Sequence, residues 1–245
     1  MEKVIYYLLS AIAAVIALTV HEYCHGYAAY KLGDDTPKSF GRLTLNPLKH
    51  IDPYGAICMV LFHVGWAKPV PINARNFKNP KRDFAITAAV GPIVNILLGF
   101  FTAPIFIISW NTYVKMSWTT PDGGFALNLL YNLTNFLSAF FFINVGLGLF
   151  NLLPIPPFDG SRLLNVFLPP KYYFAIMKYE KKIYIGVLVW LLLGDYVCRA
   201  IRMLPFIVKG SFLYGLAGIF SLSGMIGTVI DAVSNLFISF WQLFI

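Results

Sequence analysis

The apolar residues of this chain are gathered into long uncharged runs. The main runs extend from Val4 to Val20, from Phe84 to Trp110, from Gly123 to Phe158, from Ile183 to Gly194 and from Gly210 to Ile230, with an uncharged tail after Asp231. A helix of about 20 such residues crosses the hydrocarbon core of a bilayer. The pattern therefore predicts an all-α multi-pass membrane protein with about five to six transmembrane helices.

One apolar segment is too short for a simple span. Residues 53–66 (PYGAICMVLFHVGW) have the length of a re-entrant or interfacial segment, and the loops on both sides are basic. Because basic loops stay on one side of the membrane, we expect the chain to enter the membrane here and to return on the same side.

A second segment interrupts a long apolar run. Residues 151–160 (NLLPIPPFDG) carry three prolines in four positions, at 154, 156 and 157, which prevent a continuous helix. Backbone carbonyls left without partners at membrane depth are tolerated only where they are buried in protein or line a wet cavity. The sequence thus predicts a broken helix beside a cavity next to Asp159.

Composition and the placement of charge define the environment. Hydrophobic residues make up 58% of the chain and charged residues 12%, so one soluble core could not bury the apolar side chains. The net charge of +8 comes from cations concentrated in three stretches, 31–49, 68–82 and 162–182, which hold four, five and five of the nineteen Lys and Arg. Such clusters are typical of cytoplasmic loops, so we expect a lipid bilayer of the cell membrane and no nucleic acid as partner.

The same clustering of Lys and Arg predicts how the helices are oriented in the membrane. Residues 84–110 and 125–150 form an outward and returning pair, since Lys115 is the one Lys or Arg in the segment between them. The first helix then starts outside and ends in the cytoplasm, and it is read as a retained helix because no cleavable leader pattern precedes it. The number and orientation of the helices after residue 183 stay open.

Candidate chemistry begins at His21-Glu22-Tyr23-Cys24-His25. Residues four apart lie one turn above each other on a helix, so His21 and His25 would present two imidazoles to one point. A catalytic zinc ion takes three protein ligands and keeps a fourth position for water. Glu22 would be the general base that accepts the proton of this water.

Few carboxylates are available as the third ligand. Asp195 precedes Arg199 by four residues, the spacing of a helical ion pair, and most other aspartates fall in or beside loops. Asp159 stands on proline-stiffened backbone next to Gly160, which leaves room for another element. The alternative for Asp159 is a cap of a short helix beginning at Ser161.

Asn95 and Asn144, two polar residues in apolar runs, are expected to bond neighbouring helices. His50 and His63 are interpreted as loop or interfacial residues rather than ligands.

Together these motifs resemble those of the site-2 protease family of intramembrane zinc metalloproteases, in the compact prokaryotic form without PDZ or CBS domains. The resemblance covers residues 15–165 and rests first on the paired motifs His21-Glu22-x-x-His25-Gly26 and Asn151-x-x-Pro154-x-x-Pro157-x-Asp159-Gly160. Further matching stretches are Asn46-Pro47 with His50-Ile51-Asp52-Pro53-x-Gly55, Gly65-Trp66-Ala67-Lys68-Pro69-Val70-Pro71, and Gly91-Pro92-x-x-Asn95. Ser161 departs from the family pattern, in which a second glycine is frequent.

The resemblance implies particular roles for five residues. His21, His25 and Asp159 would bind one zinc ion per chain, Glu22 would be the catalytic base, and Asn151 would help to hold the substrate or its reacting carbonyl. Residues 1–170 would form the catalytic membrane core, and residues 171–245 the C-terminal transmembrane helices.

The predicted function is therefore hydrolysis of peptide bonds in or near the transmembrane segments of other membrane proteins, with the active site towards the cytoplasmic side. A metal-ion or proton transporter that uses intramembrane His and Glu is the main alternative. A transporter does not explain the HExxH spacing, and no inverted repeat is visible. A catalytically silent membrane scaffold is a third hypothesis.

Overall fold

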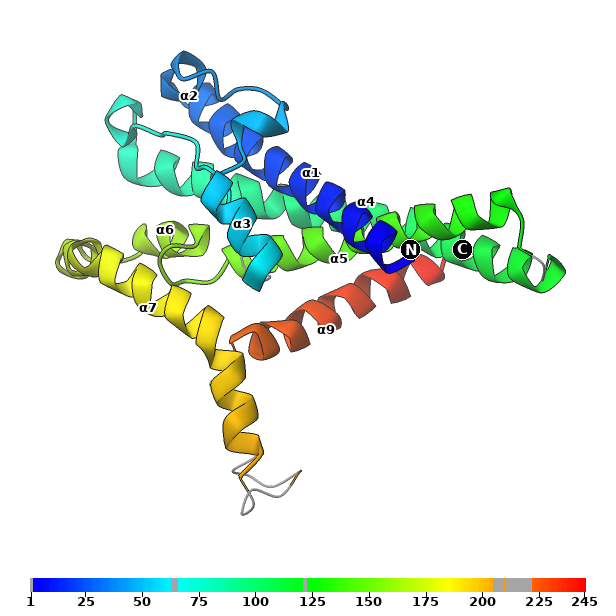
Figure 1. The fold of residues 1–245 in the computed structure, drawn as a ribbon. Helices are drawn as coiled ribbons and strands as arrows, with labels where there is room; N and C mark the ends of the chain where they lie inside the picture. The colour runs from blue at the N-terminus through cyan, green and yellow to red at the C-terminus, as the bar shows by residue number, and fades with distance from the viewer. Residues whose placement is uncertain (1, 63–65, 121–122, 205–208, 210–221) are drawn as a thin grey trace.

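A computed structural model of the chain describes residues 2–62, 66–120, 123–204, 209 and 222–245 (Figure 1). The long helices are α1 (Glu2–Lys31), α4 (Pro80–Thr119), α5 (Phe125–Asn151), α7 (Pro170–Arg202) and α9 (Leu222–Gln242). The short elements are α2 (Thr36–Ser39), α3 (Pro53–Phe62), α6 (Asp159–Asn165) and the 3-10 turns η1 (Pro47–Lys49) and η2 (Ala74–Asn76). The described residues contain no strand, so the predicted all-α class is confirmed.

Several helices are long and apolar enough to cross a membrane. Within the described residues these are α1, α4, α5 and the part of α9 from Gly224 to Gln242, and α7 gives a fifth candidate that bends by 49°. The predicted multi-pass architecture is confirmed with four to five spans. Most of the apolar run from residue 210 lies outside the described residues, and α9 continues through Asp231 instead of ending there.

Helix α4 is much longer than the apolar run that predicted it. Its 40 residues correspond to about 60 Å at 1.5 Å per residue, roughly twice the hydrocarbon thickness. Pro80 suits its first turn, and the Asp83 carboxylate accepts a hydrogen bond from the Asn79 N–H at 3.0 Å. The two ends of the helix, residues 80–83 and 111–119, include charged and polar residues, so hydropathy does not mark them as helical.

The core of the molecule is the packing of α1, α4 and α5 against one another (Figure 1). Small residues let α4 and α5 approach closely, as is usual for helices in membranes. A Cβ added at Gly148 would lie 2.8 Å from the Pro92 carbonyl oxygen, and one added at Gly99 would lie 2.6 Å from the Val145 side chain. Helix α9 crosses this pair, and its Trp241 indole donates to the Phe100 carbonyl at 2.9 Å.

The predicted re-entrant segment forms α3, and its two ends are paired. Ile51 and Ala67 make an antiparallel bridge, and the Lys68 N–H donates to the His50 carbonyl at 2.8 Å. The two ends of this segment therefore lie side by side, as is required of a segment that enters the membrane and returns on the same side.

The predicted broken helix is also present. Helix α5 ends at Asn151, an irregular stretch covers residues 152–158, and α6 starts at Asp159 with Phe158 in the capping position. Asp159 is therefore the first residue of α6 and not the cap of a helix that starts at Ser161. The Gly160 backbone lies so close to the Leu152 carbonyl that no larger residue fits, which confirms the predicted close approach.

Candidate metal centre

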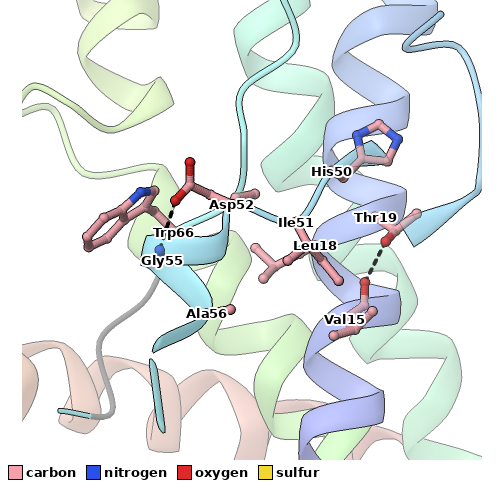
Figure 2. A pocket seen from close by; sticks show the side chains of 10 residues that line it. Val15, Leu18, Thr19, His50, Ile51, Asp52, Gly55, Ala56 and Trp66 are labelled. Carbon is pink, nitrogen blue, oxygen red and sulfur yellow. Dashed lines mark hydrogen bonds between the residues drawn. The ribbon is translucent and has the colours of Figure 1, made fainter. Parts of the chain in front are cut away.

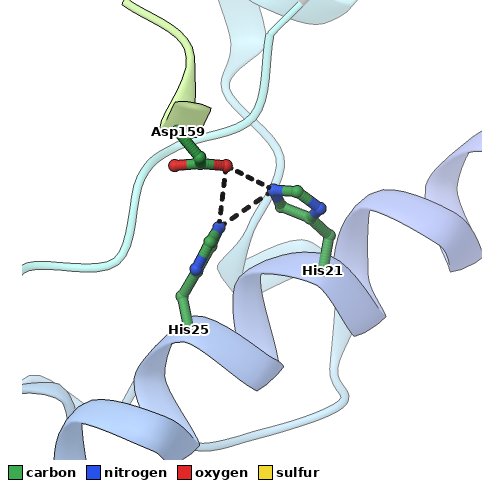
Figure 3. Close-up of side chains that lie close together, drawn as sticks. All are labelled: His21, His25 and Asp159. Atoms are coloured by element: carbon green, nitrogen blue, oxygen red, sulfur yellow. Dashed lines mark hydrogen bonds and ion pairs between the residues drawn. The ribbon is translucent and has the colours of Figure 1, made fainter. Parts of the chain in front are cut away.

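Three side chains that are distant in sequence meet at one point (Figure 3). Helix α1 carries His21 and His25 one turn apart on the face that packs on α4, and the start of α6 supplies Asp159. The Nε2 atoms of His21 and His25 each lie 3.1 Å from Asp159 Oδ2, and the two Nε2 atoms lie 2.9 Å apart. Both histidines are buried. The two HExxH histidines and the aspartate favoured by the sequence thus form one cluster.

The second nitrogen of each imidazole has a partner of its own. His21 Nδ1 lies 2.7 Å from Asn95 Oδ1, and His25 Nδ1 lies 2.7 Å from the Thr87 carbonyl oxygen. Because an oxygen of this kind can only accept, each Nδ1 carries the hydrogen and each neutral ring presents a bare Nε2 lone pair. When both rings are neutral, two lone pairs and a carboxylate oxygen therefore converge, and a metal cation bound between them would offset their mutual repulsion.

The donor set fits zinc. A tetrahedral zinc ion with bonds of 2.0–2.2 Å separates its ligand atoms by about 3.4 Å, and the three separations of 2.9–3.1 Å are close to this value. Two histidines and one carboxylate leave the fourth position open, as catalytic zinc sites do. Gly91 of α4 makes the room, because a Cβ there would lie 2.5 Å from His25 Nε2.

Glu22 follows the first histidine but lies outside the three-ligand cluster. Its Oε2 accepts a hydrogen bond from the Val70 N–H at 3.0 Å. Val70 belongs to the extended segment after α3, so the chain that returns from the re-entrant segment passes over the carboxylate of the predicted base.

Asn151 is the last residue of α5 and also lies outside the cluster. Its side-chain Nδ2 donates to the Leu147 carbonyl of the same helix at 3.0 Å. The second Nδ2 hydrogen is left over for a contact with substrate, and the role of Asn151 stays a prediction.

His50 is buried in the loop before α3, at one end of a small cavity of about 60 Å³ (Figure 2). Its Nε2 donates to the Thr44 carbonyl at 2.8 Å, and Asp52, on the other side of this cavity, accepts from the Gly55 N–H at 2.9 Å. His50 thus belongs to a loop, in agreement with the interpretation of the sequence. His63 lies outside the described residues.

Sequence reasoning did not assign the partners of the two imidazoles. The sequence predicts that Asn95 bonds a neighbouring helix without naming His21 as its partner, and the Thr87 carbonyl has no side-chain signature. A usable signal did exist, since Gly91 and Asn95 are four residues apart and therefore share one face of α4.

Comparison with known proteins identifies a family and two similar relatives. Residues 126–193 match peptidase family M50. The chain is 38% identical over 175 residues to "Putative zinc metalloprotease YwhC" of Bacillus subtilis, an alignment that covers 69% of this chain and 76% of that protein. It is 27% identical over 161 residues to "Putative zinc metalloprotease Rip2" of Mycolicibacterium smegmatis, covering 64% of this chain and 56% of that protein. No solved structure matches the chain.

The family match includes the segment that carries Asp159, and these similarities give no support to the transporter alternative. The extent and identity of the first of these relationships, together with the paired motifs, show that this membrane protein belongs to peptidase family M50, the site-2 proteases.

Proposed function

We propose that this chain is a zinc-dependent intramembrane endopeptidase in which His21, His25 and Asp159 hold one zinc ion, and that it cleaves transmembrane segments of other membrane proteins. The observation that carries the proposal is the convergence of three metal-ligating atoms within 4.8 Å of one another beside a glutamate that stays outside the ligand set. When bound, zinc would acidify a water molecule and polarise the scissile carbonyl.

Glu22 would move the proton. The Val70 N–H holds Oε2, so the carboxylate is fixed in orientation and Oε1 is left to accept a proton from the attacking water. The same carboxyl group would then deliver this proton to the leaving amine. The Asn151 amide, which uses one Nδ2 hydrogen on the Leu147 carbonyl, could donate the other to the developing oxyanion.

The membrane setting supports a membrane-protein substrate. The cluster lies between α1, a candidate span, and α6, which follows directly on the broken end of α5. The basic loops around residues 31–49 and 68–82 favour a cytoplasmic position for this end of α1 at the cell membrane. We therefore expect cleavage near the cytoplasmic end of the substrate helix.

The test separates zinc binding from proton transfer. Glu22→Gln should keep the zinc and the fold, yet lose cleavage by at least about 100-fold, because an amide cannot accept the proton of the water. Glu2→Gln, the same change at the exposed start of α1, should cleave like the parent. Zinc content and proteolysis of a reconstituted transmembrane substrate would be measured in parallel.

Two results would contradict the proposal. Undiminished cleavage by Glu22→Gln would remove this residue from the base role. Metal flux through reconstituted liposomes, with no proteolysis of any candidate helix, would favour a transporter instead.

A further inference from the structure

We propose that Asn95 and Asn144 form a directed hydrogen-bond chain that holds the His21 imidazole in the one tautomer able to bind a metal through Nε2. The inference rests on the proposed zinc site and extends it to one residue of α4 and one of α5, two helices that carry none of the three proposed ligands. Asn95 and Asn144 are thus positioning residues, which act on the metal through His21.

The chain of contacts crosses three helices. It starts in α5, where Asn144 Nδ2 donates to the Phe140 carbonyl at 2.8 Å. Asn95 Nδ2 in α4 donates to Asn144 Oδ1 at 2.7 Å, and Asn95 Oδ1 accepts from His21 Nδ1 of α1 at 2.7 Å. The far nitrogen of the same imidazole, Nε2, faces Asp159 and His25.

Two backbone carbonyls set the direction of this chain. The Phe140 carbonyl can only accept, so the nitrogen of the Asn144 amide must face it and the oxygen must face Asn95. The Ala17 carbonyl lies 3.3 Å from Asn95 Nδ2 and fixes the second amide in the same sense. Asn95 therefore offers an oxygen to His21, which requires the hydrogen on Nδ1 and leaves Nε2 free to bind a metal.

Burial makes the reverse direction costly. The side chains of Asn95 and Asn144 are both fully buried, at 0% exposure, and no water can replace a lost partner without entering the helix interface. If the Asn95 amide were flipped, its Oδ1 would face two other acceptors, Asn144 Oδ1 and the Ala17 carbonyl oxygen. Its Nδ2 would face the hydrogen on His21 Nδ1, so two donors would oppose each other. Each buried polar group left unsatisfied costs about 1–3 kcal/mol.

The other histidine does not share this dependence. His25 Nδ1 donates to a backbone carbonyl, that of Thr87, which no substitution at a side chain removes. Orientation of His21 therefore depends on side chains, and orientation of His25 on the α4 backbone. The hydrogen-bond chain joins α1, α4 and α5. Because α5 precedes the segment that carries Asp159, the same hydrogen bonds also connect that segment to the two histidines.

The experiment compares zinc affinity, by competition with a fluorescent chelator, in the purified full-length protein and four variants. Asn95→Leu should weaken zinc binding about 10- to 100-fold, the usual effect of losing the outer partner of a ligating histidine. Asn144→Leu should weaken it about 2- to 10-fold, the equivalent of one net hydrogen bond, because Ala17 still orients Asn95. Asn95→Asp keeps an acceptor for His21 but sets its second oxygen against the oxygens of Asn144 and Ala17, so it should bind zinc more tightly than Asn95→Leu and less tightly than the parent.

Thr134→Val is the matched control. Thr134 is buried between the same two helices and pairs with Ser109 at 2.6 Å, far along α4 from the chain described above. It should lower the melting temperature without changing zinc affinity. The visible absorption spectrum of bound Co²⁺ should change in Asn95→Leu and stay that of the parent in Thr134→Val, since only the former removes the partner that orients a ligating histidine.

The outcomes separate the two proposals. If the parent binds no zinc, the metal site itself is wrong and this inference falls with it. If the parent binds zinc and Asn95→Leu binds it equally well with an unchanged cobalt spectrum, the zinc site stands and the positioning role is refuted. Failure of Asn95→Asp to bind better than Asn95→Leu would equally show that the acceptor oxygen is not what matters.

Discussion

At the scale of single residues, the site depends on which imidazole nitrogens are already engaged in hydrogen bonds and which are left to bind a metal. Both imidazoles have their Nδ1 hydrogens engaged, so only Nε2 can face the Asp159 carboxylate. Two neutral nitrogens alone would make an incomplete zinc site, whereas the carboxylate adds both a third ligand and a compensating negative charge.

We therefore expect Asp159→Ala to lose most of the bound zinc while the helices stay folded. Metal analysis of the purified protein should find about one zinc per chain in the parent and well under half of that in the variant. Asp231→Ala, which changes an aspartate of α9 far from the cluster in sequence, serves as the control. Full zinc occupancy in Asp159→Ala would show that another group completes the site.

The residues that the sequence could predict are those with a fixed local spacing. The four-residue interval of His21 and His25 places both on one helix face, whatever surrounds the helix. Asn95 and Asn144 could not be assigned in the same way, because their partners lie 74 and 49 positions away. Such pairs depend on how α1, α4 and α5 are shifted along one another, and an apolar run carries little information about that shift.

At the scale of elements, the same limitation applies to helix ends. Hydropathy predicted the middle of α4 correctly but not its full length, because it detects contact with hydrocarbon and not hydrogen bonding of the backbone. The broken helix at residues 151–160 was predictable for the opposite reason. Proline removes a backbone donor wherever it stands, so its effect does not depend on distant residues.

One set of contacts joins the chain just after α1 to the segment that holds the Glu22 carboxylate, the proposed base. The Asp34 carboxylate accepts hydrogen bonds from the Thr36 N–H at 3.1 Å, the Asn73 N–H at 2.7 Å and the Asn76 side chain at 2.6 Å. Asn73 lies three residues after Val70, whose N–H holds Glu22. Asp34 thus fixes the path of the chain above the proposed active site.

We expect Asp34→Asn to destabilise the protein by about 1.5–3 kcal/mol, the value of hydrogen bonds to a charged group. Burial alone would raise the pKa of Asp34, but the hydrogen bonds from Thr36, Asn73 and Asn76 outweigh it and lower the pKa below its ordinary value. A carboxyl group with a lowered folded pKa stabilises the native state above its unfolded pKa of about 3.9 and loses this effect as the pH falls through the folded value.

The melting temperatures of parent and Asp34→Asn should accordingly differ by a constant amount above about pH 5 and converge below about pH 4. Asp35→Asn is the matched control, because the neighbouring carboxylate is exposed. A gap between parent and Asp34→Asn that widened as the pH fell would mean that the ionised carboxylate is not the stabilising form.

At the scale of the whole molecule, the distribution of cations predicts an orientation that the helices themselves do not reveal. Cysteine labelling in intact cells, in a chain from which Cys24, Cys58 and Cys198 have been replaced, can test it. Lys78→Cys should be protected from a membrane-impermeant reagent, and Lys115→Cys at the far end of α4 should react. The opposite pattern at these two positions would invert the proposed topology.

Cleavage inside a membrane also places a demand on the substrate. A transmembrane helix hides its carbonyls in its own hydrogen bonds, and each backbone group freed in hydrocarbon costs several kcal/mol unless it finds a new partner. The extended chain from Trp66 to Pro71, which runs past Glu22, is the place where an unwound peptide could regain such partners. The enzyme therefore gains most from helices that are already weak near the cut.

We expect cleavage to depend on Gly, Pro, Asn or Ser close to the cleaved bond and near the cytosolic end of the substrate helix. One glycine weakens a helix by roughly 1 kcal/mol relative to alanine, so two or three such residues should change the rate about tenfold or more. Substrates in which these residues are replaced by Leu or Ala, with the flanking sequences kept, would be compared in detergent and in liposomes, with Glu22→Gln as the inactive control. If the Leu-rich substrates were cut as fast as the parent substrate, helix unwinding would not control selection, and recognition would have to reside in the loops that flank the helix.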